Sequence, residues 1–455
     1  MHLKTLRKKK KKKKSKNRKA FLPFYFYKKN FEVLMYNIFI LKNGLRIVYE
    51  NINYVKSISV GLWIENGSRN ENSSNNGISH FIEHMMFKGT EKRSSLQLAE
   101  AIEDVGGQIN AFTGKESTCF YVKALDSYLD LSLEILSDML FNSTFNDDDI
   151  EKEKSVISEE INMSEDSPED VLSDLHSSSI WGDDSISLPI LGTSETIASF
   201  TRDNIMEYIS SHYIPENSVI SIAGNVNESE VESLAEKYFG EWNCSEKKIT
   251  HYSTPVLQIN HLHKKKNIEQ LHLSLGLPGI QTGHEDLYTL LLMSNILGGG
   301  ASSLLFQRIR EQKGLCYSIY SYISAFKNTG VISIYTSLNP RYADVVVSLI
   351  HDEIARFIDQ GISPDKLKKA KEQLKGSYML GLENTSSRMF NNGKSVLLLN
   401  KINSLDDMVS KIDRIDQNKL QEVMEKTFLK GIQNSAFVGE NVDIDIMRKI
   451  MVKRY

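Results

Sequence analysis

The sequence predicts an α+β protein built from two similar domains, each a mixed or antiparallel sheet flanked by helices, that close together like a clamshell. Length is the first observation, because 455 residues exceed the roughly 100–200 of an ordinary domain. The second is that strand and helix patterns follow one another in a similar order on both sides of a polar segment, residues 243–256. The third is an apolar and charged composition typical of a folded globular protein.

The first predicted domain covers residues 35–242. Its strands are expected at 36–41 and 45–50, a hairpin around Lys42-Asn43-Gly44, and at 55–65, 108–112, 118–125 and 218–223. An Asn-, Ser- and Gly-rich loop at 66–77 precedes a helix at 78–87, for which Ser79 is the expected N-cap. Further helices are expected at 94–105, 128–142, 147–165, 168–180 and 228–239.

The second predicted domain covers residues 257–455, and the polar segment 243–256 is the linker. Strands are expected at 270–276, 317–325, 330–337 and 436–439, and helices at 285–297, 303–311, 341–360 and 363–382. The sheet and helix order therefore resembles that of the first domain.

Charge is distributed unevenly along the chain. Residues 1–34 carry 14 Lys and Arg against one acid, Glu32, and seven of the lysines are consecutive at 8–14. Such a run repels itself, so we expect a disordered Lys-rich extension, and the start of the fold at Met35 suggests that translation begins there. A nucleic-acid or membrane-surface tail and a targeting presequence are alternative interpretations of the extension.

The remaining residues carry 41 basic and 57 acidic side chains, a net charge of −16. An acidic body offers no footprint for nucleic acid, and no run approaches the ~20 apolar residues of a membrane span. Three cysteines without CxxC spacing favour a reducing compartment. We therefore expect a cytoplasmic protein, with the mitochondrial matrix as the alternative.

The segment His80-Phe81-Ile82-Glu83-His84 has the spacing of a metal site. Residues i and i+4 of a helix share a face, so His80 and His84 can bind one tetrahedral Zn²⁺. Glu83 lies near the same face and can act as the general base that activates metal-bound water. This is the inverted HxxEH arrangement of zinc peptidases. The alternative is a pair of ordinary helix histidines.

A catalytic zinc needs a third protein ligand and an open position. The acidic helix predicted at 147–165 offers several glutamates, and composition does not choose among them: Glu151, Glu153, Glu159, Glu160 and Glu165. Glu153 and Glu160 are seven residues apart and share a face, which suits one ligand and one supporting carboxylate.

The sequence resembles the insulinase/pitrilysin family of zinc metallopeptidases, and within it the small bacterial zinc proteases and the mitochondrial processing peptidase β-subunit. The matching segments are residues 77–90, around the HxxEH motif, 106–113, 153–161, 305–311 and 314–318, and the similarity extends from about residue 35 to the end.

This resemblance assigns roles to particular residues. It implies that Glu160, 76 residues after His84, is the third zinc ligand and that Glu153 supports the metal site. Asn110 and Ala111 would bind the substrate backbone on an edge strand. Arg310 and Tyr317 of the second domain would grip the peptide and polarise its scissile carbonyl. From the residues alone, Arg310 is a helix-surface charge and Tyr317 a half-buried strand residue.

The sequence thus predicts a zinc metalloendopeptidase, with one Zn²⁺ per chain in the first domain, that hydrolyses extended peptides or presequences. The resemblance implies a homodimer or a heterodimer with a related subunit. The acidic body and the lack of an apolar span lead us to expect no nucleic-acid or membrane partner. The competing hypothesis is a non-catalytic peptide-binding or assembly subunit that keeps the motif. Zinc content measured together with peptide turnover separates the two.

Overall fold

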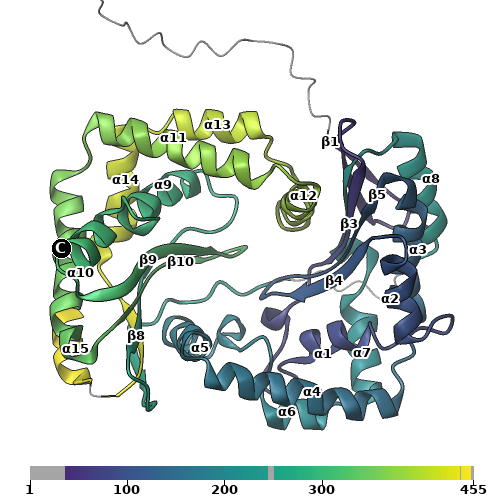
Figure 1. The fold of residues 1–455 in the computed structure, drawn as a ribbon, viewed down its shortest axis with the longest axis horizontal. Helices are drawn as coiled ribbons and strands as arrows, with labels where there is room; N and C mark the ends of the chain where they lie inside the picture. The colour runs from purple at the N-terminus through teal and green to yellow at the C-terminus, as the bar shows by residue number, and fades with distance from the viewer. Residues whose placement is uncertain (1–35, 244–250, 441, 452–455) are drawn as a thin grey trace, which may run out of the picture. The chain divides into compact units, whose positions relative to one another are not determined.

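A computed structural model describes residues 36–243, 251–440 and 442–451. The predicted Lys-rich extension, residues 1–34, and half of the predicted linker, residues 244–250, lie outside these residues. Within them, none of the helices combines the length and the apolar character that a bilayer-spanning helix requires. The predicted architecture of two mixed sheets flanked by helices is confirmed (Figure 1).

The first sheet has six strands in the order β1-β2-β6-β3-β5-β4. Only β2 and β6 are parallel, and the other neighbours are antiparallel. One face packs against helices α1, α2 and α3, and α8 packs on α3, around a large apolar cluster. The strands are β1 (Tyr36–Ile40), β2 (Arg46–Asn51), β3 (Ser57–Ile64), β4 (Gln108–Thr113), β5 (Thr118–Leu125) and β6 (Ser218–Gly224).

The helices of this half lie close to their predicted ranges. They are α1 (Ile78–Met85), α2 (Ser95–Glu103), α3 (Leu129–Asn142), α4 (Asp147–Asp166), α5 (Pro168–Trp181) and α8 (Glu228–Phe239). Two short helices that the sequence patterns do not predict, α6 (Ser194–Ser199) and α7 (Arg202–His212), precede β6.

The second sheet has five strands in the order β7-β11-β8-β10-β9, with β7 and β11 parallel. It repeats the first sheet without β1, because β7, β8, β9, β10 and β11 take the places of β2, β3, β4, β5 and β6. The predicted similarity of the two halves is therefore confirmed at the level of strand order. The strands are β7 (Asn260–Lys264), β8 (Leu271–Pro278), β9 (Cys316–Ala325), β10 (Gly330–Leu338) and β11 (Asn434–Val438).

The helices of the second half enclose a second apolar cluster. They are α9 (Leu287–Gly298), α10 (Ala343–Gln360), α11 (Pro364–Gly381), α12 (Thr385–Leu399), α13 (Leu405–Asp413), α14 (Gln417–Thr427) and α15 (Ile444–Met451). The helix predicted at 303–311 is a π-helix over its last part, η5 (Phe306–Glu311).

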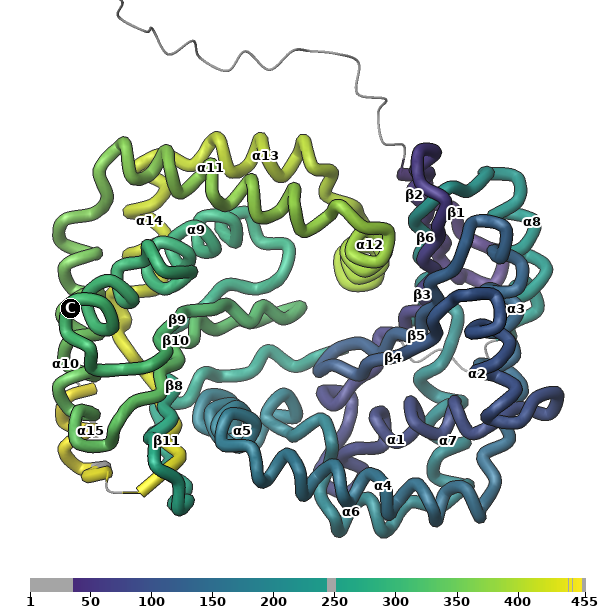
Figure 2. The backbone as a smooth tube through the Cα atoms, in the orientation of Figure 1, coloured from purple at the N-terminus to yellow at the C-terminus, as the bar shows by residue number. Residues whose placement is uncertain are grey.

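One helix of each half packs against the sheet of the other half. Helix α5 belongs to the first half but packs on β7, β8 and β11, whereas α12 belongs to the second half and packs on β2, β3 and β6 (Figure 2). The backbones of α12 and β3 approach closely at Gly61 and Gly393. A Cβ atom on Gly61 would lie 2.4 Å from the sulfur of Met389, and one on Gly393 would lie 2.2 Å from Nε1 of Trp63.

Buried polar contacts fix α12 in place. Asn392 Nδ2 donates to Glu50 at 2.9 Å, Arg388 forms an ion pair with the same carboxylate, and the hydroxyls of Ser59 and Thr385 are 2.9 Å apart. Because Glu50 is fully buried on β2, its charge depends on these partners from the other half.

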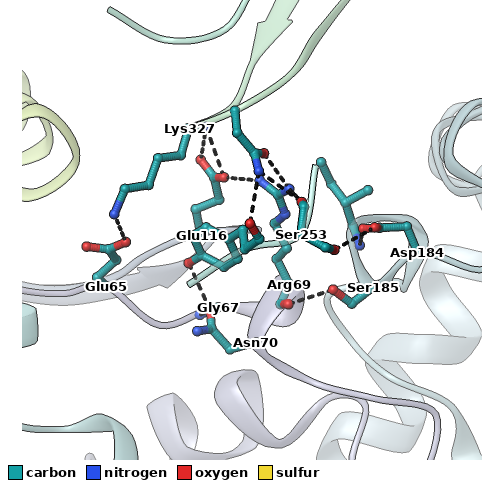
Figure 3. A network of polar contacts seen from close by, with 12 residues as sticks. Glu65, Gly67, Arg69, Asn70, Glu116, Asp184, Ser185, Ser253 and Lys327 are labelled. Carbon is teal, nitrogen blue, oxygen red and sulfur yellow. Dashed lines mark hydrogen bonds and ion pairs between the residues drawn. The ribbon is translucent and has the colours of Figure 1, made fainter. Parts of the chain in front are cut away.

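A buried polar network also joins the two halves (Figure 3). Arg69 forms an ion pair with Glu116 at 2.5 Å and donates to the carbonyl of Ser253 at 3.1 Å. The amide of Lys327, at the turn between β9 and β10, donates to both carboxylate oxygens of Glu116 at 3.0 and 3.1 Å, while its ammonium contacts Glu65. The turns of both sheets and the segment before β7 therefore share one set of buried charges.

Candidate metal centre

Helix α1 starts from an unusual cap. Gly77 has a left-handed φ of +94°, and the carboxylate of Glu71 accepts from the amides of Gly77 at 2.7 Å and Ser79 at 2.8 Å. The prediction that Ser79 is the N-cap is therefore wrong, since Ser79 lies inside the helix and Glu71 takes the free amides. Burial raises the pKa of Glu71, against the effect of these hydrogen bonds.

The structure brings His80, His84 and Glu160 together. The two imidazoles share one face of α1, and Glu160 reaches them from α4, which packs against α1. Glu160 Oε2 lies 3.7 Å from His80 Nε2 and 3.6 Å from His84 Nε2. One ligand atom from each residue lies within 4.8 Å of the others, the only such group of three in the described part of the chain.

This group fits a zinc ion by donor type and spacing. Two imidazole nitrogens and one carboxylate oxygen are the ligands of many catalytic zinc sites. Ligands held 2.0–2.1 Å from a tetrahedral ion are roughly 3.3–3.4 Å apart, close to the two separations observed. Burial, followed by the neighbouring His84, lowers the pKa of His80 to about 4, so this ring is in the neutral form that binds metals.

Glu153 holds His84 from behind. Its Oε1 is 2.8 Å from His84 Nδ1, and its Oε2 is 2.5 Å from Nζ of Lys88. Burial opposes the charge of Glu153, but the bonds to His84 and Lys88 outweigh it and lower the pKa of this carboxyl. A carboxylate at Nδ1 fixes the tautomer that leaves Nε2 free for a metal.

Glu83 turns toward strand β4 rather than α4. Its Oε2 accepts a hydrogen bond from the hydroxyl of Thr113, the last residue of β4. Burial raises the pKa of the Glu83 carboxyl, while the Thr113 bond opposes that rise. Sequence reasoning missed both Thr113 and Lys88. Thr113 could have been noticed, because every second residue of a strand points to the same face and Thr113 therefore shares a face with Ile109 and Ala111.

Asn110 and Ala111 lie on β4, which is the edge strand of the first sheet. Asn110 is exposed, and its Oδ1 accepts from the amide of Ala111 at 2.7 Å. Thr113 follows Asn110 by three positions on the same strand, so the predicted substrate strand ends at the side chain that contacts Glu83.

Arg310, on η5, lies beside Tyr317, which is near the start of β9. The Arg310 guanidinium carbon is 5.6 Å from the ring centre of Tyr317 and 4.6 Å from that of Phe306. Tyr317 is 73% exposed, so the residue-based expectation of a half-buried side chain is wrong, because the ring projects from an edge strand. Among the described residues, no hydrogen bond or ion pair connects these two side chains to His80, His84 or Glu160.

Comparison with known proteins gives consistent matches. Residues 46–194 match the model of the insulinase family (peptidase family M16), and residues 199–374 match the peptidase M16 inactive domain. The uncharacterized zinc protease YmxG of Bacillus subtilis is 43% identical, over 85% of this chain and 94% of the relative. An uncharacterized zinc protease of Streptomyces coelicolor is 36% identical, over 84% of this chain and 85% of the relative.

Solved structures share the fold. A protease from Helicobacter pylori aligns with a TM-score of 0.83 at 23% identity, over 89% of this chain and 99% of that one. The peptidase M16 inactive domain from Pseudomonas fluorescens aligns with a TM-score of 0.84 at 17% identity, over 90% of this chain and 98% of that one. The family models and the identity to the bacterial relatives show that this chain belongs to the insulinase family of peptidases, family M16.

Proposed function

We propose that this chain is a zinc-dependent endopeptidase that hydrolyses extended peptides. One observation carries the proposal. His80, His84 and Glu160 place three zinc-type ligand atoms within 4.8 Å of one another, and the adjacent Glu83 is held separately by Thr113. The names of the relatives as zinc proteases support the choice of metal.

In this proposal His80, His84 and Glu160 hold one zinc ion. When bound, the zinc lowers the pKa of a coordinated water and polarises the scissile carbonyl. Glu153 keeps His84 Nε2 directed toward Glu160, and Lys88 keeps Glu153 charged.

Glu83 is the general base. It accepts a proton from the attacking water and passes it to the nitrogen of the leaving amine. The burial that raises its pKa also makes it a better proton acceptor. Because the other oxygen of its carboxylate is held by Thr113, one oxygen remains for the water.

The peptide is expected to add as a strand at the free edge of β4, along Asn110 and Ala111. Arg310 and Tyr317 would contact the peptide from the second half, and Tyr317 would donate to the carbonyl oxygen as it becomes negative. Targeting presequences are among the extended peptides that suit such a site. Since the relatives reported above are bacterial, we place the activity in a bacterial cytoplasm and not in mitochondria.

The test measures zinc content and peptide cleavage on the full chain. Glu83→Gln should keep about one zinc per chain and lose at least ~100-fold in kcat, because it removes the general base. Glu160→Gln should lower the zinc content, while Glu159→Gln, an exposed neighbour on α4, should change neither quantity. Zinc-loaded protein that cleaves no peptide, or Glu83→Gln with unchanged turnover, would contradict the assignment.

A further inference from the structure

Thr113 occupies the junction between two parts of the proposed site. It is the last residue of β4, which pairs with β5 alone among the described strands. Its side chain shares the face of Ile109 and Ala111, the face that packs toward α1. Thr113 therefore connects the strand expected to bind the peptide with the helix that carries Glu83.

The hydroxyl of Thr113 has one strong acceptor. It donates to Glu83 Oε2, and an ionised carboxylate can only accept. The other nearby hydroxyl, that of Thr118, is 3.5 Å away and gives its own proton to the carbonyl of Asn66 at 2.9 Å. The proton of Thr113 is thus directed to Glu83 by the surrounding contacts.

We propose that Thr113 is a positioning residue for the general base, an inference that rests on the proposed peptidase function. The Glu83 side chain is half-buried, and the bond from Thr113 to one carboxylate oxygen restricts the rotation of the whole group. The second oxygen is then left to accept the proton of the attacking water. Misplacement of a reacting group by about 1 Å can cost on the order of 100-fold in rate.

The placement also links substrate binding to the base. Asn110, Ala111 and Thr113 lie on one short strand, so a peptide paired with β4 is held in register with the hydroxyl that orients Glu83. The same strand would set both the position of the scissile bond and the direction of the base.

The experiment compares three variants of the full chain. Thr113→Val keeps the shape but removes the donor, Thr113→Ser keeps the donor, and Thr427→Val makes the same chemical change in α14. The hydroxyl of Thr427 bonds only to a carbonyl of its own helix in the described contacts. Zinc content, thermal unfolding, kcat and KM are measured for each protein with one peptide.

We expect Thr113→Val to lose about 10- to 100-fold in kcat, with KM changed less than about threefold and zinc content unchanged. Thr113→Ser should recover kcat to within about threefold of wild type, which also shows that the position tolerates substitution. Thr427→Val should match wild type.

Other results overturn the inference. These are an unchanged kcat in Thr113→Val, a loss confined to KM, or a Thr113→Ser variant as slow as Thr113→Val. A wild-type chain that cleaves no peptide would instead remove the proposed function and this inference with it. If the wild-type chain is active and Thr113→Val has the same kcat, this inference is wrong while the proposed function stands.

Discussion

The two halves of this protein share a strand order but differ in what lies between corresponding strands. Between β3 and β4 the first half inserts α1, whose histidines face Glu160 of α4. Between β8 and β9 the second half inserts α9, an apolar helix whose Leu290, Leu292 and Met293 are fully buried. The helix in the place of α4, α11, is rich in lysine, whereas α4 is rich in acidic residues.

The difference shows that this fold does not itself create a metal site. A few polar positions on α1 and α4 give the first half a candidate set of zinc ligands, which the described residues of the second half lack. The second half still acts on the first, because its helix α12 completes the core over β2, β3 and β6. We therefore expect different effects from substitutions in α12, in α5 and at the candidate metal site.

The largest expected effect comes from α12. Arg388→Met leaves the carboxylate of Glu50 fully buried without its cation, and breaking a buried pair in this way costs about 3–5 kcal/mol. The midpoint of urea unfolding, followed by tryptophan fluorescence, measures the loss. The double variant Arg388→Met with Glu50→Met, which removes both charges, should recover part of it. A single variant as stable as wild type would show that charge does not anchor α12.

An intermediate effect is expected at the metal site. In Glu153→Gln the carboxylate that contacts His84 Nδ1 is replaced by a neutral amide. The loss of such a supporting contact is expected to lower the zinc affinity about 10- to 100-fold. Competition with a chelating zinc indicator measures the affinity. The control is Glu151→Gln, an exposed glutamate two residues earlier on α4, for which affinity should be unchanged. If the two variants bound zinc with equal affinity, Glu153 would have no supporting role at the metal site.

The smallest effect is expected at a neutral hydrogen bond between α5 and the second sheet. His176 Nδ1 is 2.8 Å from the hydroxyl of Ser274 on β8, and burial lowers the pKa of this histidine to about 3. Ser274→Ala should cost about 1 kcal/mol, the worth of one neutral hydrogen bond, in the same urea assay. A loss as large as that of Arg388→Met would erase the contrast between the two helices.

The same histidine gives stability a pH dependence. Its pKa is near 6.5 in the unfolded chain and lower in the fold, so only the unfolded chain binds its proton below pH 6.5. The free energy of unfolding should therefore decrease as the pH falls below 6.5, and His176→Asn should make this decrease smaller. Urea midpoints at pH 7 and pH 5 test this, and identical slopes for both proteins would contradict it.

The sequence predicted the parts of the site that are local. His80, Glu83 and His84 lie within one helical turn or so, and the face shared by Glu153 and Glu160 follows from helix geometry. The choice of Glu160 came from the family resemblance, and the structure places that residue beside both histidines.

The features that sequence reasoning missed depend on distant partners. Glu71, which precedes α1 by several residues, replaces Ser79 as the cap because the loop folds back over the helix start. Helix α12 is rich in Ser and Asn, residues of modest helix propensity, and its stability comes from packing on the other half. Thr113 resembles any strand residue until β4 is placed against α1.

The most direct test of this account is the metal content of the purified full chain, measured by inductively coupled plasma mass spectrometry beside the variant His84→Ala. We expect one zinc per wild-type chain and almost none in the variant, because within the described residues only the first half supplies a ligand group. A second zinc per chain, or zinc retained in full by His84→Ala, would contradict the claim that α1 and α4 alone form the metal centre.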